Sequence, residues 1–429
     1  MNTPIPAPPK AAAGAPTAPR GTAAAANVAG TIVVLPALPL FVYYLWYCLA
    51  FNHGHPALPS LDMLRQLPLP TAKSAAIVAG WLILQALLAH YVPGRVVEGT
   101  ALPDGTRLSY KLNGWRAWWL TGALLASCAA LRLYSPAALA DEFGPLLTTA
   151  NIFTAVFCIY LYWHGRRFGT PHERTTHNVI YDFWLGTALN PRIGDFDLKL
   201  FFEARPGLIA WIVLDLAFAA KQFQLNGFVS LPMALVCAFQ FWYVADYFAN
   251  EEAILSTWDI RHENFGCMLC WGDLVWVPFT YTIQAQYLLQ HSVDLPWWAA
   301  AGIVALNVAG YILFRGANIQ KHRFRSNPDR TIWGKPAAYV KTASGSLLLT
   351  SGFWGMARHM NYLGDLLMAL AWCLPCGFAS PLPYFYVVYL TILLVHRERR
   401  DNDTCAQRYG SDWDTYCAKV RYRIVPGVY

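Results

Sequence analysis

The chain alternates between long apolar stretches and shorter polar or basic connections. Ten apolar stretches reach, or nearly reach, the length that a helix needs to cross a hydrocarbon layer about 30 Å thick. They cover residues 27–51, 74–93, 115–133, 146–163, 206–220, 230–248, 268–289, 297–314, 363–377 and 383–396. The fifth, ninth and tenth stretches are short or punctuated. The pattern predicts an all-α, polytopic integral membrane protein with about ten transmembrane helices.

The composition agrees with this pattern. Hydrophobic residues make up 56% of the chain and charged residues only 13%, whereas a soluble domain carries roughly 25% charged residues. Residues 1–26 are rich in Ala, Pro, Gly and Thr, and we expect a disordered tail there. The apolar stretch that follows is too long for the core of a cleaved signal peptide. We therefore expect a single membrane domain over 27–429.

The loop charges predict the orientation of this domain. Most loop Lys and Arg residues fall near 94–114, 164–205, 249–267 and 315–362, and the connections near 134–145 and 290–296 contain none. Arg65, Lys73 and Lys221 are the exceptions. Positive residues concentrate in cytoplasmic loops, so we expect both termini and the long loops on the cytoplasmic side. The tail from His396 is too polar to span and rich in aromatic residues, and we expect it to fold onto the cytoplasmic face.

Two Cys-x-x-Cys pairs lie in or beside apolar stretches, at Cys267 and Cys270 and at Cys373 and Cys376. A second ligand pair at the spacing of a zinc site does not accompany either of them. Small thiols in apolar surroundings behave as hydrophobic side chains. We interpret both pairs as packing residues and predict no metal site.

Ionisable residues inside apolar stretches are candidates for function, because burying a charge in a bilayer is costly. Tyr243 and Asp246 are three residues apart and share one helix face. Further acids follow the same half of the chain, namely Asp215, Glu251, Glu252, Asp273 and Asp365. Each of them alone is explained by helix capping or by pairing with a nearby cation. Their concentration favours a shared polar cavity.

Three further segments combine charge with aromatic or amide groups. The stretch Arg315 to Arg325 is either cytoplasmic positive charge, an anionic-lipid contact or a clamp for phosphate. Downstream, Trp354 and Tyr362 suit stacking on a planar ring and Asn361 suits a carboxamide, although interfacial aromatic belts have similar composition. Asp401 is either a partly buried proton donor or one charge in a solvated run. No nucleotide-binding glycine motif is present.

These segments resemble the sterol C14, C7 and C24(28) reductase family, which includes the sterol reductase domain of the lamin B receptor. The resemblance covers Leu108-Ser-Tyr-Lys-Leu-Asn-Gly114, Leu189-Asn-Pro-Arg-Ile-Gly194 and the tail with Cys405-Ala-Gln-Arg-Tyr-Gly410. Glu251-Glu-Ala-Ile-Leu-Ser-Thr-Trp-Asp259 and Phe314-Arg-Gly-Ala-Asn-Ile-Gln-Lys321 look most like the C14 branch.

The resemblance implies an enzyme that reduces the C14=C15 double bond of sterol intermediates with NADPH, with the cofactor site mainly in 315–429. The resemblance also implies a cofactor site at the positions that match the family's dinucleotide-binding residues. These positions are Lys321, Arg325, Leu349, Trp354, Asn361, Tyr362, Asp401, Cys405, Ala406, Gln407, Arg408, Tyr409 and Tyr416. The expected partners are a sterol entering from the bilayer and membrane lipid. Neither nucleic acid nor an obligate protein partner is expected. The membrane would be the endoplasmic reticulum in a eukaryote and the cytoplasmic membrane in a bacterium.

An isolated double bond accepts hydride only after a proton has made it a cation. The reaction therefore requires a positioned acid, and Tyr243 and Asp401 are the catalytic candidates, with Arg397 orienting Asp401. Three alternatives stay open at this point. They are a C7 or C24(28) sterol reductase on the same scaffold, a membrane transporter with intramembrane carboxylates, and a non-catalytic sterol-binding protein.

Overall fold

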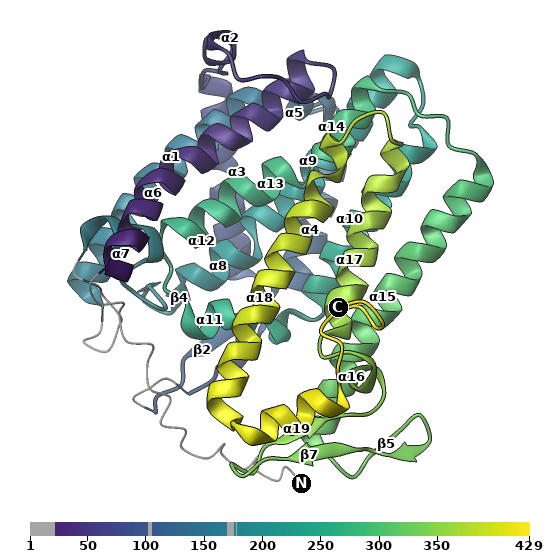
Figure 1. Ribbon diagram of the computed structural model, residues 1–429. Helices are drawn as coiled ribbons and strands as arrows, with labels where there is room; N and C mark the ends of the chain where they lie inside the picture. Colours follow the sequence, from purple (N-terminus) through teal and green to yellow (C-terminus); the bar gives the residue numbers. More distant parts are fainter. Residues whose placement is uncertain (1–21, 102–104, 170–175, 177) are drawn as a thin grey trace. The chain divides into compact units, whose positions relative to one another are not determined.

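A computed structural model describes residues 22–101, 105–169, 176 and 178–429 of the chain (Figure 1). The expected disordered tail, 1–26, lies mostly outside these residues, and its last five residues already belong to the first helix. The longer helices are α1 (Thr22–Phe51), α3 (Ala72–Tyr91), α4 (Gly114–Ala130), α6 (Phe143–Phe168), α9 (Pro206–Asn226), α10 (Leu231–Ala249), α15 (Trp297–Ser326), α17 (Met360–Cys373) and α18 (Phe385–Tyr409).

Shorter helical segments connect them: α2 (Leu61–Arg65), α5 (Ala137–Asp141), α7 (Val179–Leu185), α8 (Leu198–Ala204), η1 (Glu251–Ser256), α11 (Trp258–His262), α12 (Cys267–Trp271), η2 (Gly272–Trp276), α13 (Val277–Thr280), α14 (Ile283–Gln290), α16 (Phe353–Met356), η3 (Leu374–Cys376), η4 (Leu382–Tyr384) and α19 (Ser411–Lys419). The strands form four antiparallel pairs: β1 (Arg95–Glu98) with β2 (Ser109–Leu112), β3 (Arg192–Ile193) with β4 (Phe196–Asp197), β5 (Thr331–Ile332) with β6 (Lys335–Pro336), and β7 (Tyr339–Lys341) with β8 (Leu347–Leu349).

The prediction of a helical membrane protein is confirmed in its coarse form. Among the described residues, six helical segments are long and apolar enough to cross a membrane: Val28–Phe51, Ala72–Tyr91, Phe143–Phe168, Leu198–Asn226, Leu231–Ala249 and Trp297–Ser326. Three of the other predicted spans form the helices α4, α17 and α18. The first two are short, with 17 and 14 residues, and the second half of α18 is charged.

The seventh predicted span, 268–289, is not one continuous helix. It is divided into α12, the π-helical turn η2, α13 and α14. Pro278 stands in the first turn of α13, where its missing N–H does no harm. Gly207 of α9 packs against η2 so closely that a Cβ there would lie 1.8 Å from the carbonyl oxygen of Asp273. The break therefore accommodates a close helix contact.

Two predicted spans continue well beyond their apolar ends. The helix α15 runs past Phe314 to Ser326, and α18 runs past His396 to Tyr409 (Figure 1). The expectation of a loop over 315–362 is therefore wrong in its first quarter, because residues 315–326 continue the helix α15. Arg323 and Arg325 occupy the last turn of α15, where cations stabilise the negative end of the helix dipole.

Contacts within the chain group it into two compact units. The larger unit comprises residues 18–294 and 376–383, and the smaller one includes 295–375 and 384–429. In the larger unit a buried ion pair joins Arg205 to Glu251, with 3.2 Å between Nη2 and Oε1. Arg205 also donates to the Asn113 side chain, and Glu251 accepts from the backbone N–H of Gly114 at 2.8 Å. This network ties the start of α9 to the start of α4.

In the smaller unit, α15 and α17 lie against each other in antiparallel fashion through facing glycines. A Cβ on Gly310 would lie 2.7 Å from the Gly364 carbonyl oxygen, and one on Gly364 would lie 2.5 Å from the Phe314 nitrogen. Only glycines allow this approach. The C-terminal segment also packs into this unit, since Trp413, Tyr416 and Val420 form a buried cluster with Val340 of β7.

Candidate functional site

The charged end of α15 faces an aromatic ring from α16. The Nζ atom of Lys321 lies 3.9 Å from the centre of the Trp354 ring, which is within cation–π range. The indole N–H of Trp354 donates to the carbonyl oxygen of Ala317 at 2.8 Å, and this fixes the ring against α15. Trp354 is only 5% exposed. Lys321 therefore covers one face of the ring that we expected to stack on a ligand.

Asp401 of α18 meets the beginning of α17. Its Oδ2 lies 3.6 Å from Nε2 of His359, and the Tyr362 ring stacks on the His359 ring with 4.7 Å between ring centres. Asp401 also interacts electrostatically with Lys321, Arg325 and Arg397. These contacts bring together predicted site residues that are up to eighty positions apart in the sequence.

Burial dominates the protonation behaviour of this cluster. The side chain of Asp401 is 52% exposed, and its partial burial raises its pKa above the usual value, against the smaller opposing effect of Lys321. Burial also lowers the pKa of His359 to about 3, with the positive charges of Lys321 and Arg358 adding to the effect. His359 is thus a neutral imidazole at pH 7, so its contact with Asp401 is not an ion pair. Burial raises the pKa of Tyr362 to about 12, and its hydroxyl keeps its proton.

Side-chain contacts hold α18 and the segment after α19 in place around this cluster. The buried Glu398 accepts from Nη1 of Arg423 at 2.9 Å and from the Tyr429 hydroxyl at 3.3 Å. The tail also lies along the start of α17, because the backbone N–H groups of Arg358 and His359 donate to the carbonyl oxygens of Tyr422 and Arg423. The last residues of the chain therefore position the helix that carries Asp401.

Asn361 provides an independent sign that this region is prepared for a ligand. Its side-chain oxygen is buried, yet it accepts no hydrogen bond from any residue that the structure describes. A buried acceptor without a donor costs roughly 1–3 kcal/mol, and such atoms call for an explanation. A ligand with an N–H group, such as a carboxamide, would provide that donor.

The remaining predicted cofactor residues lie in the same unit but differ in exposure. Leu349 of β8 is buried in one cluster with Trp354 and Ala317. Tyr416 is buried and stacks on Trp413 with 5.0 Å between ring centres. Ala406, Gln407 and Arg408 are exposed along the last turns of α18, next to the partly exposed Cys405 and Tyr409. Arg325 is exposed at the end of α15.

Tyr243, the other catalytic candidate, belongs to the larger unit. It lies on α10, partly buried, with its ring 6.3 Å from the ring of Trp211. Asp246, one turn further on, is also partly buried and accepts from the Asn250 side chain at 3.3 Å. The two residues share a helix face as the sequence indicates.

The intramembrane acids, which we expected to share a polar cavity, differ in the partners that hold them. Glu251 is held by Arg205, whereas Glu252 pairs with Arg95 at the surface. Asp215 is fully buried on α9. The apolar cavity lined by α3 and the smaller one lined by α1 contain none of these acids in their walls. Glu251 and Asp273 both act electrostatically on Tyr247 of α10.

His359 is a residue to which sequence reasoning gave no role. It contacts both Asp401 and Tyr362, the two groups at the centre of the cluster. The only sequence signal was its position next to Asn361 and Tyr362. That signal is weak because the partner, Asp401, comes forty residues later and on another helix.

Comparisons with known proteins identify the family of the chain. A sequence model of the ergosterol biosynthesis ERG4/ERG24 family matches residues 23–429. The delta(14)-sterol reductase of Methylotuvimicrobium alcaliphilum is 54% identical over 403 residues, which are 93% of this chain and 94% of that relative. The delta(14)-sterol reductase of Dictyostelium discoideum is 46% identical over 94% of this chain and 91% of the relative.

A third relative, the delta(14)-sterol reductase LBR of Gallus gallus, is 42% identical over 92% of this chain but only 62% of its own length. The match therefore covers nearly all of the present chain and only part of that longer protein. The resemblance drawn from the sequence is confirmed by these matches. This chain belongs to the ergosterol biosynthesis ERG4/ERG24 family.

Proposed function

We propose that the protein reduces the C14=C15 double bond of sterol intermediates, with NADPH as the hydride donor. The observation that carries the proposal is the name delta(14)-sterol reductase on relatives that are 54% and 46% identical over more than nine-tenths of this chain. The smaller unit supports the cofactor part of the proposal. It offers the cations around Asp401 and the side-chain oxygen of Asn361, which accepts no hydrogen bond from any described residue.

The dinucleotide would be held by the charged end of α15 and by the start of α17. Lys321 and Arg325 would bind phosphate groups, the 2′-phosphate among them, because the two cations interact electrostatically at the end of α15 and charge-assisted hydrogen bonds to phosphate are strong. Asn361 would accept from the carboxamide N–H of the nicotinamide. The exposed turns of α18, from Cys405 to Tyr409, together with Tyr416 would close over the bound molecule.

The chemistry consists of one proton and one hydride. When bound, NADPH supplies a hydride that C14 accepts. The protein must first deliver a proton to C15, and this moves the π electrons so that C14 becomes a tertiary cation. The hydride and its electron pair then form the new C14–H bond, and the acid recovers its proton from water. The residues must also keep water away from the cation, which an apolar pocket does.

Asp401 and Tyr243 are the candidate acids. Burial raises the pKa of Asp401, so a larger fraction of this carboxyl carries its proton near neutral pH. Arg397 acts in the opposite direction by lowering that pKa, and its proposed role is to orient the carboxyl group. Tyr243 offers a phenol on the apolar helix α10.

The deciding experiment follows both hydrogens with isotopes. Purified protein is incubated with an 8,14-dienyl sterol and NADPH deuterated at the transferred position, or with ordinary NADPH in D₂O, and the products are analysed by mass spectrometry and NMR. The proposal predicts one deuterium at C14 in the first case and one at C15 in the second. Deuterium at C7 or C24 of other dienes, with no C14 product, would instead indicate a C7 or C24(28) reductase.

We also propose a multi-pass orientation with both termini cytoplasmic. The charge distribution supports it, since most loop Lys and Arg residues fall in the loops that this orientation places in the cytoplasm. Three basic residues depart from this pattern, and each is paired with an acid: Arg65 bonds Asp62 at 3.0 Å, Lys73 bonds Glu142 at 3.0 Å, and Lys221 bonds Asp141 at 2.8 Å.

A further inference from the structure

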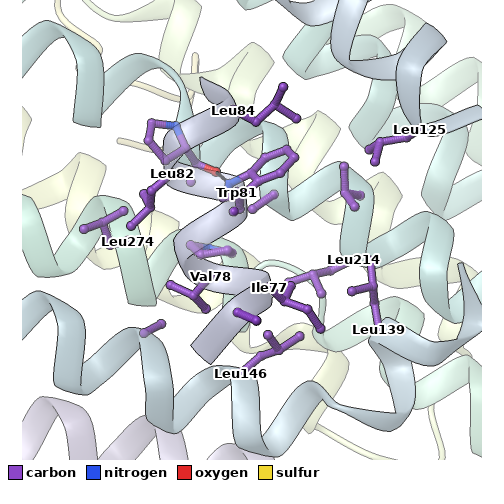
Figure 2. A pocket seen from close by; sticks show the side chains of 18 of the residues that line it. Ile77, Val78, Trp81, Leu82, Leu84, Leu125, Leu139, Leu146, Leu214 and Leu274 are labelled. Carbon is purple, nitrogen blue, oxygen red and sulfur yellow. Dashed lines mark hydrogen bonds between the residues drawn. The ribbon is translucent and has the colours of Figure 1, made fainter. Parts of the chain in front are cut away.

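The larger unit contains an apolar cavity of about 650 Å³ that the proposed reaction does not use. Its walls come from α3, α4, α5, α6, α9 and the segment η2–α13. Figure 2 shows Ile77 and Trp81 of α3 facing side chains such as Leu139 and Leu214 across the space. A volume of this size is typical of pockets that enclose a small organic ligand.

The cavity is separate from the candidate acid in the same unit. Ala210 and Leu214 of α9 line it, whereas Trp211 does not. Trp211 projects from another side of α9, where its ring lies 6.3 Å from that of Tyr243. No residue of α10 is among those that line the cavity. The cavity therefore lies against one face of α9, and Tyr243 of α10 lies near a different face of the same helix.

The lining limits the chemistry of an occupant to a largely apolar body. Most lining side chains are Leu, Ile, Val, Ala or Phe, as the labelled residues in Figure 2 illustrate. The one indole N–H, on Trp81, is already bonded to the Pro206 carbonyl oxygen at 3.0 Å. Along α3 the lining extends from Lys73 to Leu84, roughly 16 Å at 1.5 Å per residue. This is room for a long and rigid molecule.

One wall atom points to a hydrogen-bonding ligand. Thr154 of α6 lies between this cavity and a smaller one beside α1 and α12, and it lines both. It is fully buried, and its hydroxyl has no hydrogen-bond partner among the residues that the structure describes. A hydroxyl left in this state costs free energy, and helical threonines usually bond the preceding turn instead. A ligand hydroxyl would satisfy it.

The cavity also has a few polar lining residues, and the one charge among them is balanced. Lys73 lines the cavity and pairs with Glu142 at 3.0 Å, and Tyr134 and Ser135 are further polar lining residues. Because Glu142 already neutralises the ammonium group, the lining offers no net positive charge to a phosphate headgroup. A neutral amphiphile fits better than an anionic phospholipid.

We infer that this cavity is a second sterol site, distinct from the place where reduction occurs. The occupant is a sterol whose rigid apolar body fills the space between α3 and α9 and whose single hydroxyl bonds Thr154. The choice of a sterol rests on the proposed function, which makes sterols the lipids that this protein handles. The site holds a sterol without reacting with it, because no residue proposed as acid or cofactor ligand lines it.

The test uses the full chain in lipid nanodiscs with a photoreactive sterol that carries a diazirine on its ring system. After irradiation, labelled peptides are identified by mass spectrometry. Label is expected on α3, α6 and α9. Gly80 lines the cavity, and a Cβ there meets no atom within 4 Å, so Gly80→Phe fills the space and should reduce labelling of these helices about tenfold or more.

Gly122→Phe is the matched control. Gly122 also lies within a helix of the larger unit and also has no atom within 4 Å of an added Cβ, but it does not line the cavity. Labelling should stay at the wild-type level. Ala210→Phe, which enters from the opposite wall, should reproduce the loss seen with Gly80→Phe. Thr154→Val keeps the shape and removes the hydroxyl, and it should weaken labelling about 2- to 10-fold.

Sterol reduction is measured in the same samples, which separates the two proposals. Retained turnover with lost labelling in Gly80→Phe supports a second site. Unchanged labelling of α3, α6 and α9 in both Gly80→Phe and Ala210→Phe overturns it, as does equal competition by a phospholipid without sterol. Loss of turnover together with labelling in folded Gly80→Phe also overturns it, because the cavity would then be the reaction site. Absence of reduction by the wild-type protein would instead refute the proposed function.

Discussion

Two cations, the buried Arg205 of the larger unit and the partly buried Lys321 of the smaller unit, differ in their partners. Arg205 is 3% exposed and its guanidinium has partners from within the chain, Glu251 and Asn113. Lys321 is partly buried and faces the Trp354 ring. Among the residues that the structure describes, no carboxylate lies within 4.0 Å of its ammonium group. Asp401 acts on Lys321 only from further away.

The difference separates a charge that serves the fold from one that is available to a ligand. Removing one partner of a buried ion pair leaves an uncompensated charge, which is strongly destabilising. A cation over an aromatic ring keeps its positive charge directed at whatever approaches, and burial strengthens its interaction with an anion. Mutation of a cation should therefore lower stability in the larger unit, at Arg205, and ligand binding in the smaller unit, at Lys321.

The largest expected effect is on catalysis. Asp401→Asn and Tyr243→Phe each preserve side-chain volume closely, so each protein should fold. If the residue is the acid, kcat should fall about 10²- to 10⁴-fold while sterol affinity stays within a few-fold. Steady-state kinetics and NADPH binding are measured together. A loss explained wholly by weaker NADPH binding would make Asp401 a cofactor ligand, and full activity of Tyr243→Phe would remove Tyr243 from the mechanism.

The second effect is on stability and concerns Arg205. Arg205→Met should lower the free energy of unfolding by about 3–5 kcal/mol, because Glu251 then stays buried without a cation. Thermal unfolding in detergent measures it. Arg65→Met is the matched control, since its pair with Asp62 is exposed on both sides, and it should cost only about 0–1 kcal/mol. Equal losses in the two variants would contradict a structural role that depends on burial.

The third effect distinguishes the two reduced cofactors. Lys321→Ala should weaken NADPH binding by about 1.5–3 kcal/mol, the contribution of a charge-assisted contact, and Arg325→Ala should do the same. NADH binding should change far less, because it lacks the 2′-phosphate. Lys341→Ala, at an exposed position of β7, is the control for loss of one positive charge. Equal losses for both cofactors would assign Lys321 to the fold instead.

The smallest effect is on pH dependence. Because the pKa of His359 is lowered to about 3 in the folded protein, only the unfolded chain takes up this proton between about pH 6.5 and 3. Stability contributed by neutral His359 is therefore lost as the pH falls, by about 1 kcal/mol between pH 7 and 5.5. The raised pKa of Asp401 acts with the opposite sign.

A comparison of His359→Gln with the wild-type protein isolates the histidine. The variant should lose less stability on acidification than the wild type, as measured by the shift of the unfolding temperature between the two pH values. Asp401→Asn serves as the second reference, because it removes the opposing contribution. An identical pH response in His359→Gln and the wild type would show that His359 does not stay neutral in the folded protein.

Much of the helical framework could be predicted because apolar length is a local property of the chain. The stretches 74–93 and 230–248 appear as α3 and α10 within a few residues of the predicted bounds. The broken seventh span could not be predicted, since the break depends on Gly207 of α9 approaching the backbone of η2. The extension of α15 to Ser326 was missed because polar helical turns and polar loops have similar composition.

The sequence by itself determined that this is a helical membrane protein and, through its motifs, that it belongs to a sterol reductase family. It also determined which residue types are available near the cofactor site, since charged and aromatic residues concentrate in 315–429. Only the tertiary structure decided which of them meet. Asp401 lies beside His359, and Arg205 rather than a ligand holds Glu251. The reason is physical: composition and periodicity report on burial along one segment, whereas pairing of charges depends on distances between segments far apart in the chain.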